Sequence, residues 1–124
     1  MHSNTCRLWI DAPVKVDAVQ AALDGEIGAQ FEGLAVACDL DRNEGFDPGR
    51  ADGTDFIAMS PWTAWLEAVG TDEPAVDAFQ AGVCRMVSRL RAQGFLVTAA
   101  CDFEDRVIAE TGWNWTVGRP HPPA

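Results

Sequence analysis

Two pairs of acidic residues are the first candidates for chemistry in this sequence. Asp39 and Asp41 close one apolar run, and a second run of similar sequence closes with Asp102 and Glu104. Paired carboxylates can act as acid, base or nucleophile when they lie about 5–9.5 Å apart. The fold expected below puts the two runs on opposite edges of one sheet, about 14 Å apart at strand spacings of about 4.8 Å. We therefore predict two separate acidic patches and no joint catalytic site.

The first acidic pair also begins a pattern that resembles a calcium-binding loop. Asp39 and Asp41 are spaced as in an EF-hand, but the match then fails. Glu44 stands where that loop needs glycine, and Arg50 stands where it needs a bidentate acid. The alternative that stays open is a looser cation site formed by Asp39, Asp41, Glu44 and Asp47. The sequence predicts no metal and no cofactor.

Side chains for nucleophilic or acid–base catalysis are scarce. The two histidines, His2 and His121, stand near the ends of the chain, and there is no tyrosine. Ser60 and Ser88 have no internal histidine to complete a triad. The cysteines form no C-x-x-C motif and are expected to be buried, reduced thiols: Cys6, Cys38, Cys84 and Cys101. These features predict a protein that is not an enzyme.

The charge balance narrows the class of partner. The chain has 124 residues, with 9 Lys and Arg against 19 Asp and Glu and a net charge of -10. Nucleic-acid binding needs clustered basic residues, so we expect neither a nucleic acid nor a membrane as partner. An acidic surface suits a basic protein partner, with solubility alone as the simpler interpretation. We find neither a signal-peptide pattern nor a membrane-spanning apolar run and predict a cytoplasmic protein.

Hydrophobic patterns define the elements that must position these residues. The sequence predicts a strand over 6–10, a helix from Pro13 that stops at Gly25 or Gly28, a strand over 31–40 and a loop over 42–55. It then predicts a strand over 55–69 disturbed near Pro61, with a helix over 60–69 as the alternative, a helix from Thr71 to Gly94 and a strand over 95–103. The tail is compatible with an added strand over 113–117.

This order of elements predicts an α+β domain of the ferredoxin-like βαββαβ type. Two helices would cover one face of a four-stranded antiparallel sheet and leave the second face without helices. The length predicts a single domain over 1–124, with its core at about 5–106 and a C-terminal extension over 107–124.

Five tryptophans are too many for the core of so small a domain. Tryptophan is enriched at binding hot spots, and Trp62 and Trp65 follow the long acidic loop. The alternative is that the rings cover the open sheet face or a self-dimer interface. We predict a partner-binding site that combines these two rings with the acids of the loop and its preceding strand: Asp39, Asp41, Glu44, Asp47, Trp62 and Trp65.

Two segments carry a family resemblance. Gly94 to Asp105 and Arg42 to Asp47 resemble an A-A-C-D-[FY]-E-[DE] strand end and an R-N-x-x-[FY]-D loop of small, acidic, uncharacterised actinobacterial-type proteins. The resemblance covers residues 7–106 by order and pattern, and Trp113 and Trp115 have no counterpart in it. Such proteins resemble the immunity proteins of polymorphic-toxin systems. The resemblance implies a toxin inhibitor that occludes an active site with its acidic surface.

A second function remains open at this stage. Ferredoxin-like domains also serve as small-molecule-binding or regulatory domains that dimerise through the open sheet face. A monomer with an exposed acidic patch would favour the inhibitor, whereas a dimer with a ligand pocket would favour the regulatory domain.

Overall fold

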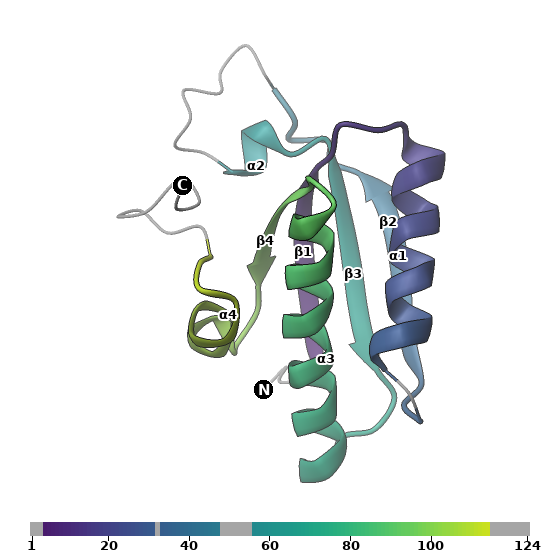
Figure 1. Cartoon of the computed structure of the whole chain (residues 1–124), viewed down its shortest axis with the longest axis vertical. Coiled ribbons are helices and arrows are strands. Elements are labelled where there is room, and N and C mark those ends of the chain that lie inside the picture. The colour runs from purple at the N-terminus through teal and green to yellow at the C-terminus, as the bar shows by residue number, and fades with distance from the viewer. Residues whose placement is uncertain (1–3, 32, 48–55, 115–124) are drawn as a thin grey trace.

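The computed structural model describes residues 4–31, 33–47 and 56–114. Its strands are β1 (Thr5–Asp11), β2 (Val36–Arg42), β3 (Trp62–Ala68) and β4 (Leu96–Ala100). Its helices are α1 (Val16–Gln30), α2 (Phe56–Met59), α3 (Glu73–Ala92) and α4 (Glu104–Thr111). Helices α1 and α3 lie side by side across one face of the sheet, and α4 packs beside α3 and β4 (Figure 1).

The four strands form one sheet in the order β2-β3-β1-β4, and every neighbouring pair is antiparallel. The register places Leu66 of β3 opposite Cys6 of β1 on one side and Cys38 of β2 on the other. Strands β2 and β4 are therefore the outer strands. The predicted α+β class with a four-stranded antiparallel sheet is confirmed.

Alternation along the strands sends every second side chain under the two long helices. The core joins strand residues Cys6, Leu8, Ile10, Ala64, Leu66, Ala68, Val97 and Ala99 to helix residues Val19, Leu23, Phe79, Val83, Met86, Val87 and Leu90. Val107 of α4 belongs to the same core, which therefore extends past residue 106.

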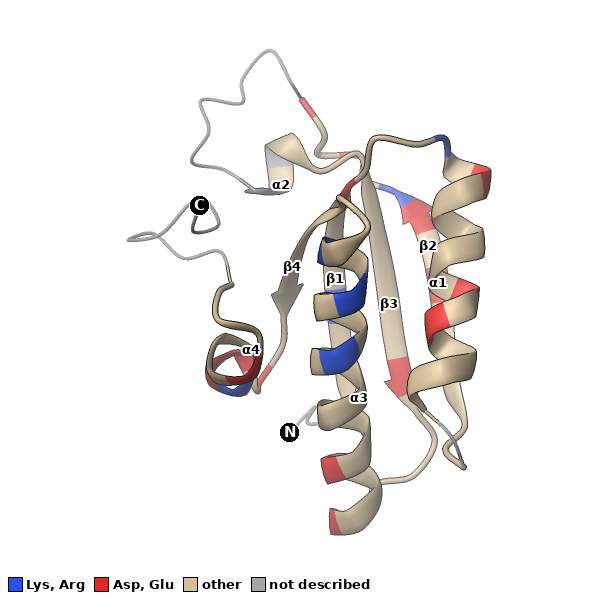
Figure 2. Cartoon of the chain, viewed as in Figure 1, with Lys and Arg blue, Asp and Glu red and all other residues tan. Residues whose placement is uncertain are grey.

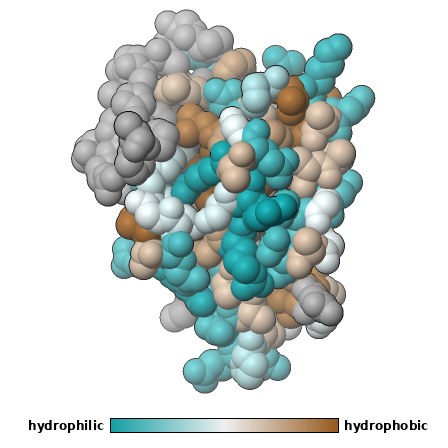
Figure 3. Space-filling view, viewed as in Figure 1, coloured by the Kyte–Doolittle hydropathy of each residue, from teal (hydrophilic) through white to brown (hydrophobic). Residues whose placement is uncertain are grey.

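Helix α3 is the element whose sequence pattern is strongest, and its prediction is confirmed. Asp72 caps its first turn by accepting a hydrogen bond from the backbone N of Ala75 at 2.9 Å. Arg89 and Arg91 occupy the last turn, opposite in charge to the helix C-terminus. Figure 2 shows acidic residues at the start of α3 and basic residues in its second half. Hydrophilic residues gather along this helix on the surface (Figure 3).

The prediction that Gly25 or Gly28 ends the first helix is wrong, because α1 continues to Gln30. Both glycines are exposed, and each costs the helix only about 1 kcal/mol. Burial of neighbouring apolar residues outweighs that cost. The next strand also begins later than expected, since Phe31 ends the helix and stacks on Phe79 of α3 with ring centroids 5.8 Å apart.

A close approach between the two long helices depends on a third glycine. A Cβ atom on Gly82 of α3 would lie 2.4 Å from the ring of Phe31. No side chain fits there, so glycine at this position lets the aromatic ring seat against the α3 backbone.

Segment 55–69 divides into two elements where the sequence predicts one. A short helix, α2, precedes Pro61, and the strand begins at Trp62, so the strand assignment holds for β3 and is wrong for 56–59. The amide of Asn43 donates to the carbonyls of Ile57 and Ser60, both at 2.7 Å, and these bonds fix the turn.

The last strand is shorter than predicted, because it ends at Ala100 and α4 begins at Glu104. Helix α4 is not among the elements predicted from the sequence, because its amphipathic pattern is only eight residues long. Trp113 and Asn114 are not part of a strand, and residues 115–117 lie outside the described residues.

Candidate functional site

The face of the sheet opposite the long helices carries polar and aromatic side chains. Its residues are those that alternate with the core positions: Thr5, Arg7, Trp9 and Asp11 of β1, Ala37, Asp39 and Asp41 of β2, Thr63, Trp65 and Glu67 of β3, and Leu96, Thr98 and Ala100 of β4. We call this set the second face. Arg7 is the one basic residue among the second-face positions of the described strands.

Arg7 contacts three neighbouring side chains at the centre of the second face. Its Nη1 donates to Oγ1 of Thr63 at 3.0 Å, and its guanidinium carbon lies 5.1 Å from the ring centroid of Trp65. It also lies 6.0 Å from the ring of Trp9. A cation between two indoles is attracted by both ring faces. Arg7 therefore fixes the rings and the strand pair beneath them.

The acids of β2 lie in the same rows as these rings. The register pairs Asp39 with Trp65 and Asp41 with Thr63. Both carboxylates are exposed, and neither has an ion-pair or hydrogen-bond partner within the described residues. Nε1 of Trp65 donates to Oε1 of Glu67 at 3.2 Å, which turns the indole toward a third acid. The outer part of the second face is therefore acidic and aromatic.

The loop after β2 adds two more exposed acids. Glu44 and Asp47 follow Asn43, which is buried and organises the loop. Oδ1 of Asn43 accepts from the backbone N of Gly45 at 2.9 Å. The backbone N of Asn43 donates to the carbonyl of Pro61 at 2.9 Å, continuing the strand pairing by one residue. The loop therefore starts from a fixed point at the end of the acidic strand.

The structure brings part of the predicted site together and separates the rest. Asp39, Asp41 and Trp65 share the second face, with Glu44 just beyond them. Trp62 has the opposite phase along β3 and packs against the core under the helices. Trp62 and Trp65 therefore lie on opposite faces of the sheet and cannot form one surface.

The two acidic pairs singled out in the sequence lie at opposite edges of the sheet. Asp39 and Asp41 are on outer strand β2, and Asp102 and Glu104 follow outer strand β4. Burial raises the pKa of Glu104, and the nearby Asp105 raises it further. Among the described residues, no group of three or more His, Cys, Asp and Glu lies close enough together to hold a metal ion.

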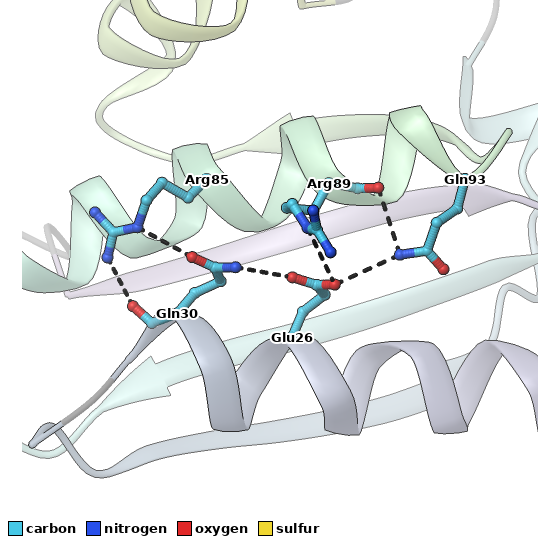
Figure 4. A network of polar contacts seen from close by, with 5 residues as sticks. All are labelled: Glu26, Gln30, Arg85, Arg89 and Gln93. Atoms are coloured by element: carbon cyan, nitrogen blue, oxygen red, sulfur yellow. Dashed lines mark hydrogen bonds and ion pairs between the residues drawn. The ribbon is translucent and has the colours of Figure 1, made fainter.

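A second polar cluster links the two long helices on the other side of the sheet (Figure 4). The carboxylate of Glu26, on α1, accepts from Nε2 of Gln30 at 3.0 Å and from Nε2 of Gln93 at 3.4 Å. Nε of Arg89 lies 3.7 Å from the same carboxylate. Arg85 donates to the side chain of Gln30 at 3.1 Å and to its backbone carbonyl at 2.7 Å. These contacts hold α1 against α3.

A hollow of about 300 Å³ lies beside this cluster. Its lining comes from α1, α3 and α4: Gln30, Cys84, Arg85, Ser88, Arg89 and Glu110. Burial, with a further contribution from Glu110, raises the pKa of the Cys84 thiol to about 11. That thiol stays protonated near neutral pH and is a weak nucleophile. The other cysteines are also free thiols.

Sequence reasoning missed the residues that complete the second face. Arg7, Thr63 and Glu67 were not singled out, because only the register shows that they neighbour Trp65 and Asp39. The alternation along β1 could have predicted part of this set, since Arg7 and Trp9 alternate with the buried residues of that strand and so share one face.

The chain matches no protein-family model, no curated protein and no solved structure. No described helix has both the length and the apolar character needed to cross a membrane.

Proposed function

We propose that this protein is a non-catalytic binding protein, and that the acidic part of its second face binds a basic protein. The observation that carries the proposal is the pair Asp39 and Asp41, two exposed carboxylates without described partners beside the indole of Trp65. Unpaired surface charge attracts an oppositely charged partner over a Debye length of about 8–10 Å. An adjoining aromatic ring supplies the contact area that such interfaces use as an anchor.

The most specific form of the proposal is an immunity protein that acts in the cytoplasm. The partner would be a toxin domain with a basic active-site cleft, and the acidic face would occlude that cleft. The net charge of -10 and the resemblance to immunity proteins support this choice. Steering by charge would make association fast and sensitive to salt.

The test is capture from a lysate of the source organism with the tagged protein, washed at low and then at high salt. We expect one basic protein that salt releases. The variant Asp39→Lys with Asp41→Lys should lose it, whereas Asp102→Lys with Asp105→Lys, which changes the charge equally at the other edge, should retain it. Co-expression should then show that the captured protein is toxic alone and harmless with the wild type.

Equal capture by both variants would overturn the proposed face. A captured protein that is harmless when expressed alone would overturn the immunity function while leaving the binding function in place.

The ferredoxin-like architecture belongs to the same proposal. The strand order β2-β3-β1-β4, with α1 and α3 packed on one face, supports it. In such domains the face without helices is a common site of association.

The hollow beside Arg85 and Arg89 favours a second candidate, a small-molecule-binding or regulatory domain, dimeric through its second face. Both arginines already contact residues of α1, which leaves this candidate with weaker support. A ligand-dependent rise in melting temperature together with a dimer in light scattering would favour it over the binding protein.

A further inference from the structure

The backbone of β2 presents hydrogen-bonding groups that no described residue uses. At the two ends of its pairing with β3, Asn43 donates to Pro61 at 2.9 Å and Val69 donates to Ala35 at 3.1 Å. These bonds show that the odd-numbered residues of β2 direct their N–H and C=O groups toward β3. In an antiparallel ladder the alternate residues direct theirs the other way. Val36, Cys38 and Leu40 therefore point their backbone groups out of the sheet.

At the opposite edge of the sheet, side chains bind the outward backbone N–H and C=O groups of β4. On β4 the carbonyl of Val97 accepts from Nε and Nη2 of Arg91 at 3.2 and 2.9 Å. The backbone N of Ala99 donates to Oδ1 of Asn114 at 2.9 Å, and the carbonyl of Ala99 accepts from Nδ2 of Asn114 at 2.8 Å. The side chain of Asn114 thus occupies the place of a neighbouring strand. Nothing comparable covers β2 among the described residues.

The side chains of β2 define what could pair with it. On the second face are Ala37, Asp39 and Asp41, all exposed. On the helix side, Val36, Cys38 and Leu40 are half-buried and pack against the core. A strand placed alongside would continue both rows, with basic residues on the second face and apolar residues on the helix side. Asp24 of α1 adds a further negative charge near Cys38.

A second copy of this chain is a poor occupant of the edge. Pairing of β2 with its own copy in an antiparallel arrangement would bring Asp39 and Asp41 against the acids of the copy. Like charges on neighbouring strands destabilise the pair, and each chain carries a net charge of -10. The charge of the edge requires a partner of the opposite sign.

We propose that the free edge of β2 binds an extended segment of a basic protein as a fifth strand, with its lysine or arginine side chains over Asp39 and Asp41. This inference rests on the proposed function and specifies its geometry. The strand has seven residues, enough to pair with a segment of similar length. Backbone hydrogen bonds would supply affinity, and the acidic row would select positively charged sequences.

The test uses the full chain and a synthetic seven-residue peptide in which valine and lysine alternate, acetylated and amidated at its ends. A matched peptide with glutamate for lysine is the charge control. We expect the lysine peptide to bind, to slow amide hydrogen exchange at Val36, Cys38 and Leu40, and to bind at least about tenfold more tightly than the glutamate peptide. Asp39→Asn with Asp41→Asn should reduce this preference, and Asp102→Asn with Asp105→Asn should not.

N-methylated peptides identify the edge without altering the protein. In one, the valine nitrogens are methylated, and in the other the lysine nitrogens. Only one of these sets faces β2 in a strand pairing. We expect one peptide to lose at least about tenfold in affinity and the other to bind as the parent does.

Equal affinity of the two methylated peptides would overturn strand addition. If such binding were still sensitive to salt, the acidic face would retain its proposed function. Absence of any binding by the lysine peptide, or dimers formed through β2, would also overturn the inference. Conversely, a clear methylation pattern together with no partner in the lysate experiment would overturn the proposed function and leave the edge as a strand-binding site.

Discussion

The two outer strands of the sheet differ in whether side chains of the chain bind their outward-facing backbone N–H and C=O groups. On β4, the side chains of Arg91 and Asn114 bind the groups of Val97 and Ala99. On β2, the outward groups of alternate residues have no described partner, and the side chains beside them are acidic. Exposed strand edges invite pairing with other chains, and charge is one way to limit it. The comparison indicates that side chains of the chain itself close the edge of β4, whereas the edge of β2 is open and, in our proposal, its acidic row selects a basic segment.

The residues after α4 that close the edge of β4, which we call the closed edge, are also buried. Asn114 is 2 % exposed and Trp113 is 3 % exposed. The guanidinium of Arg91 lies 4.9 Å from the ring centroid of Trp113 and donates to its carbonyl at 2.7 Å. The segment after α4 is therefore fastened to the sheet through one arginine and one asparagine. Substitutions should distinguish the two edges by what they change, stability at β4 and binding at β2.

The largest effect is expected at Asn114. Asn114→Ala leaves the N–H and C=O of Ala99 buried without partners, which we expect to lower the free energy of unfolding by about 3 kcal/mol. Urea denaturation measures this change. Asn4→Ala is the control, since the side chain of Asn4 donates one half-buried hydrogen bond, to the carbonyl of Ala68, and its loss should cost less than about 1 kcal/mol. Similar losses in the two variants would contradict the closed-edge interpretation.

Arg91→Met should lower the free energy of unfolding by about 2 kcal/mol. The substitution keeps the apolar stem but removes the bonds to the carbonyls of Val97 and Trp113 and to Oγ1 of Thr111. Arg91→Lys retains the charge without the planar fork and should recover only part of the loss. Urea denaturation of both variants measures these changes. If Arg91→Lys had the free energy of unfolding of the wild type, the positive charge alone would account for the contribution of Arg91.

At β2, whose edge is open, substitutions should leave the free energy of unfolding measured by urea denaturation almost unchanged. Asp39→Asn with Asp41→Asn should change the free energy of unfolding by no more than about 0.5 kcal/mol, because both side chains are exposed and without described partners. A loss above about 1 kcal/mol would show that these acids stabilise the fold, and the contrast between the edges would fail.

The smallest expected effect is on the chemistry of Cys38. Burial, then Asp24 and Asp39, raises the pKa of its thiol to about 11. Since the thiolate is the reactive form, alkylation by iodoacetamide should increase with pH up to about that value. Asp39→Asn removes one negative neighbour, lowers the pKa and should raise the rate at pH 8.5 by about twofold. Peptide mapping by mass spectrometry separates Cys38 from the other thiols. An unchanged rate would place Asp39 too far away to act on this thiol.

Local sequence signals predicted most of the strands and the longest helix. The apolar stripe and the acidic cap of α3 are local features, and both appear where expected. The glycines of α1 gave the wrong helix end, because packing outweighed a local preference of about 1 kcal/mol. Helix α4 is short, and its core contact through Val107 depends on distant residues.

The candidate site was predicted in part. The strand expected over 31–40 is enough to put Asp39 and Asp41 on one face, since alternation is a property of the strand itself. Trp62 and Trp65 were assigned to one surface, yet an odd spacing along a strand puts them on opposite faces. A helix over 60–69 would have put both indoles on one side, but the segment from Trp62 to Ala68 is a strand.

The sequence by itself determined the acidic charge, the class of fold, and the alternation that exposes the acids of β2. These depend on composition and on short-range periodicity, which are present in the chain before it folds. Only the tertiary structure decided that Arg7 joins Trp65 and Thr63, and that Asn114 closes β4 while β2 stays open. Register and edge position come from pairing between segments far apart in sequence, and no local pattern specifies them.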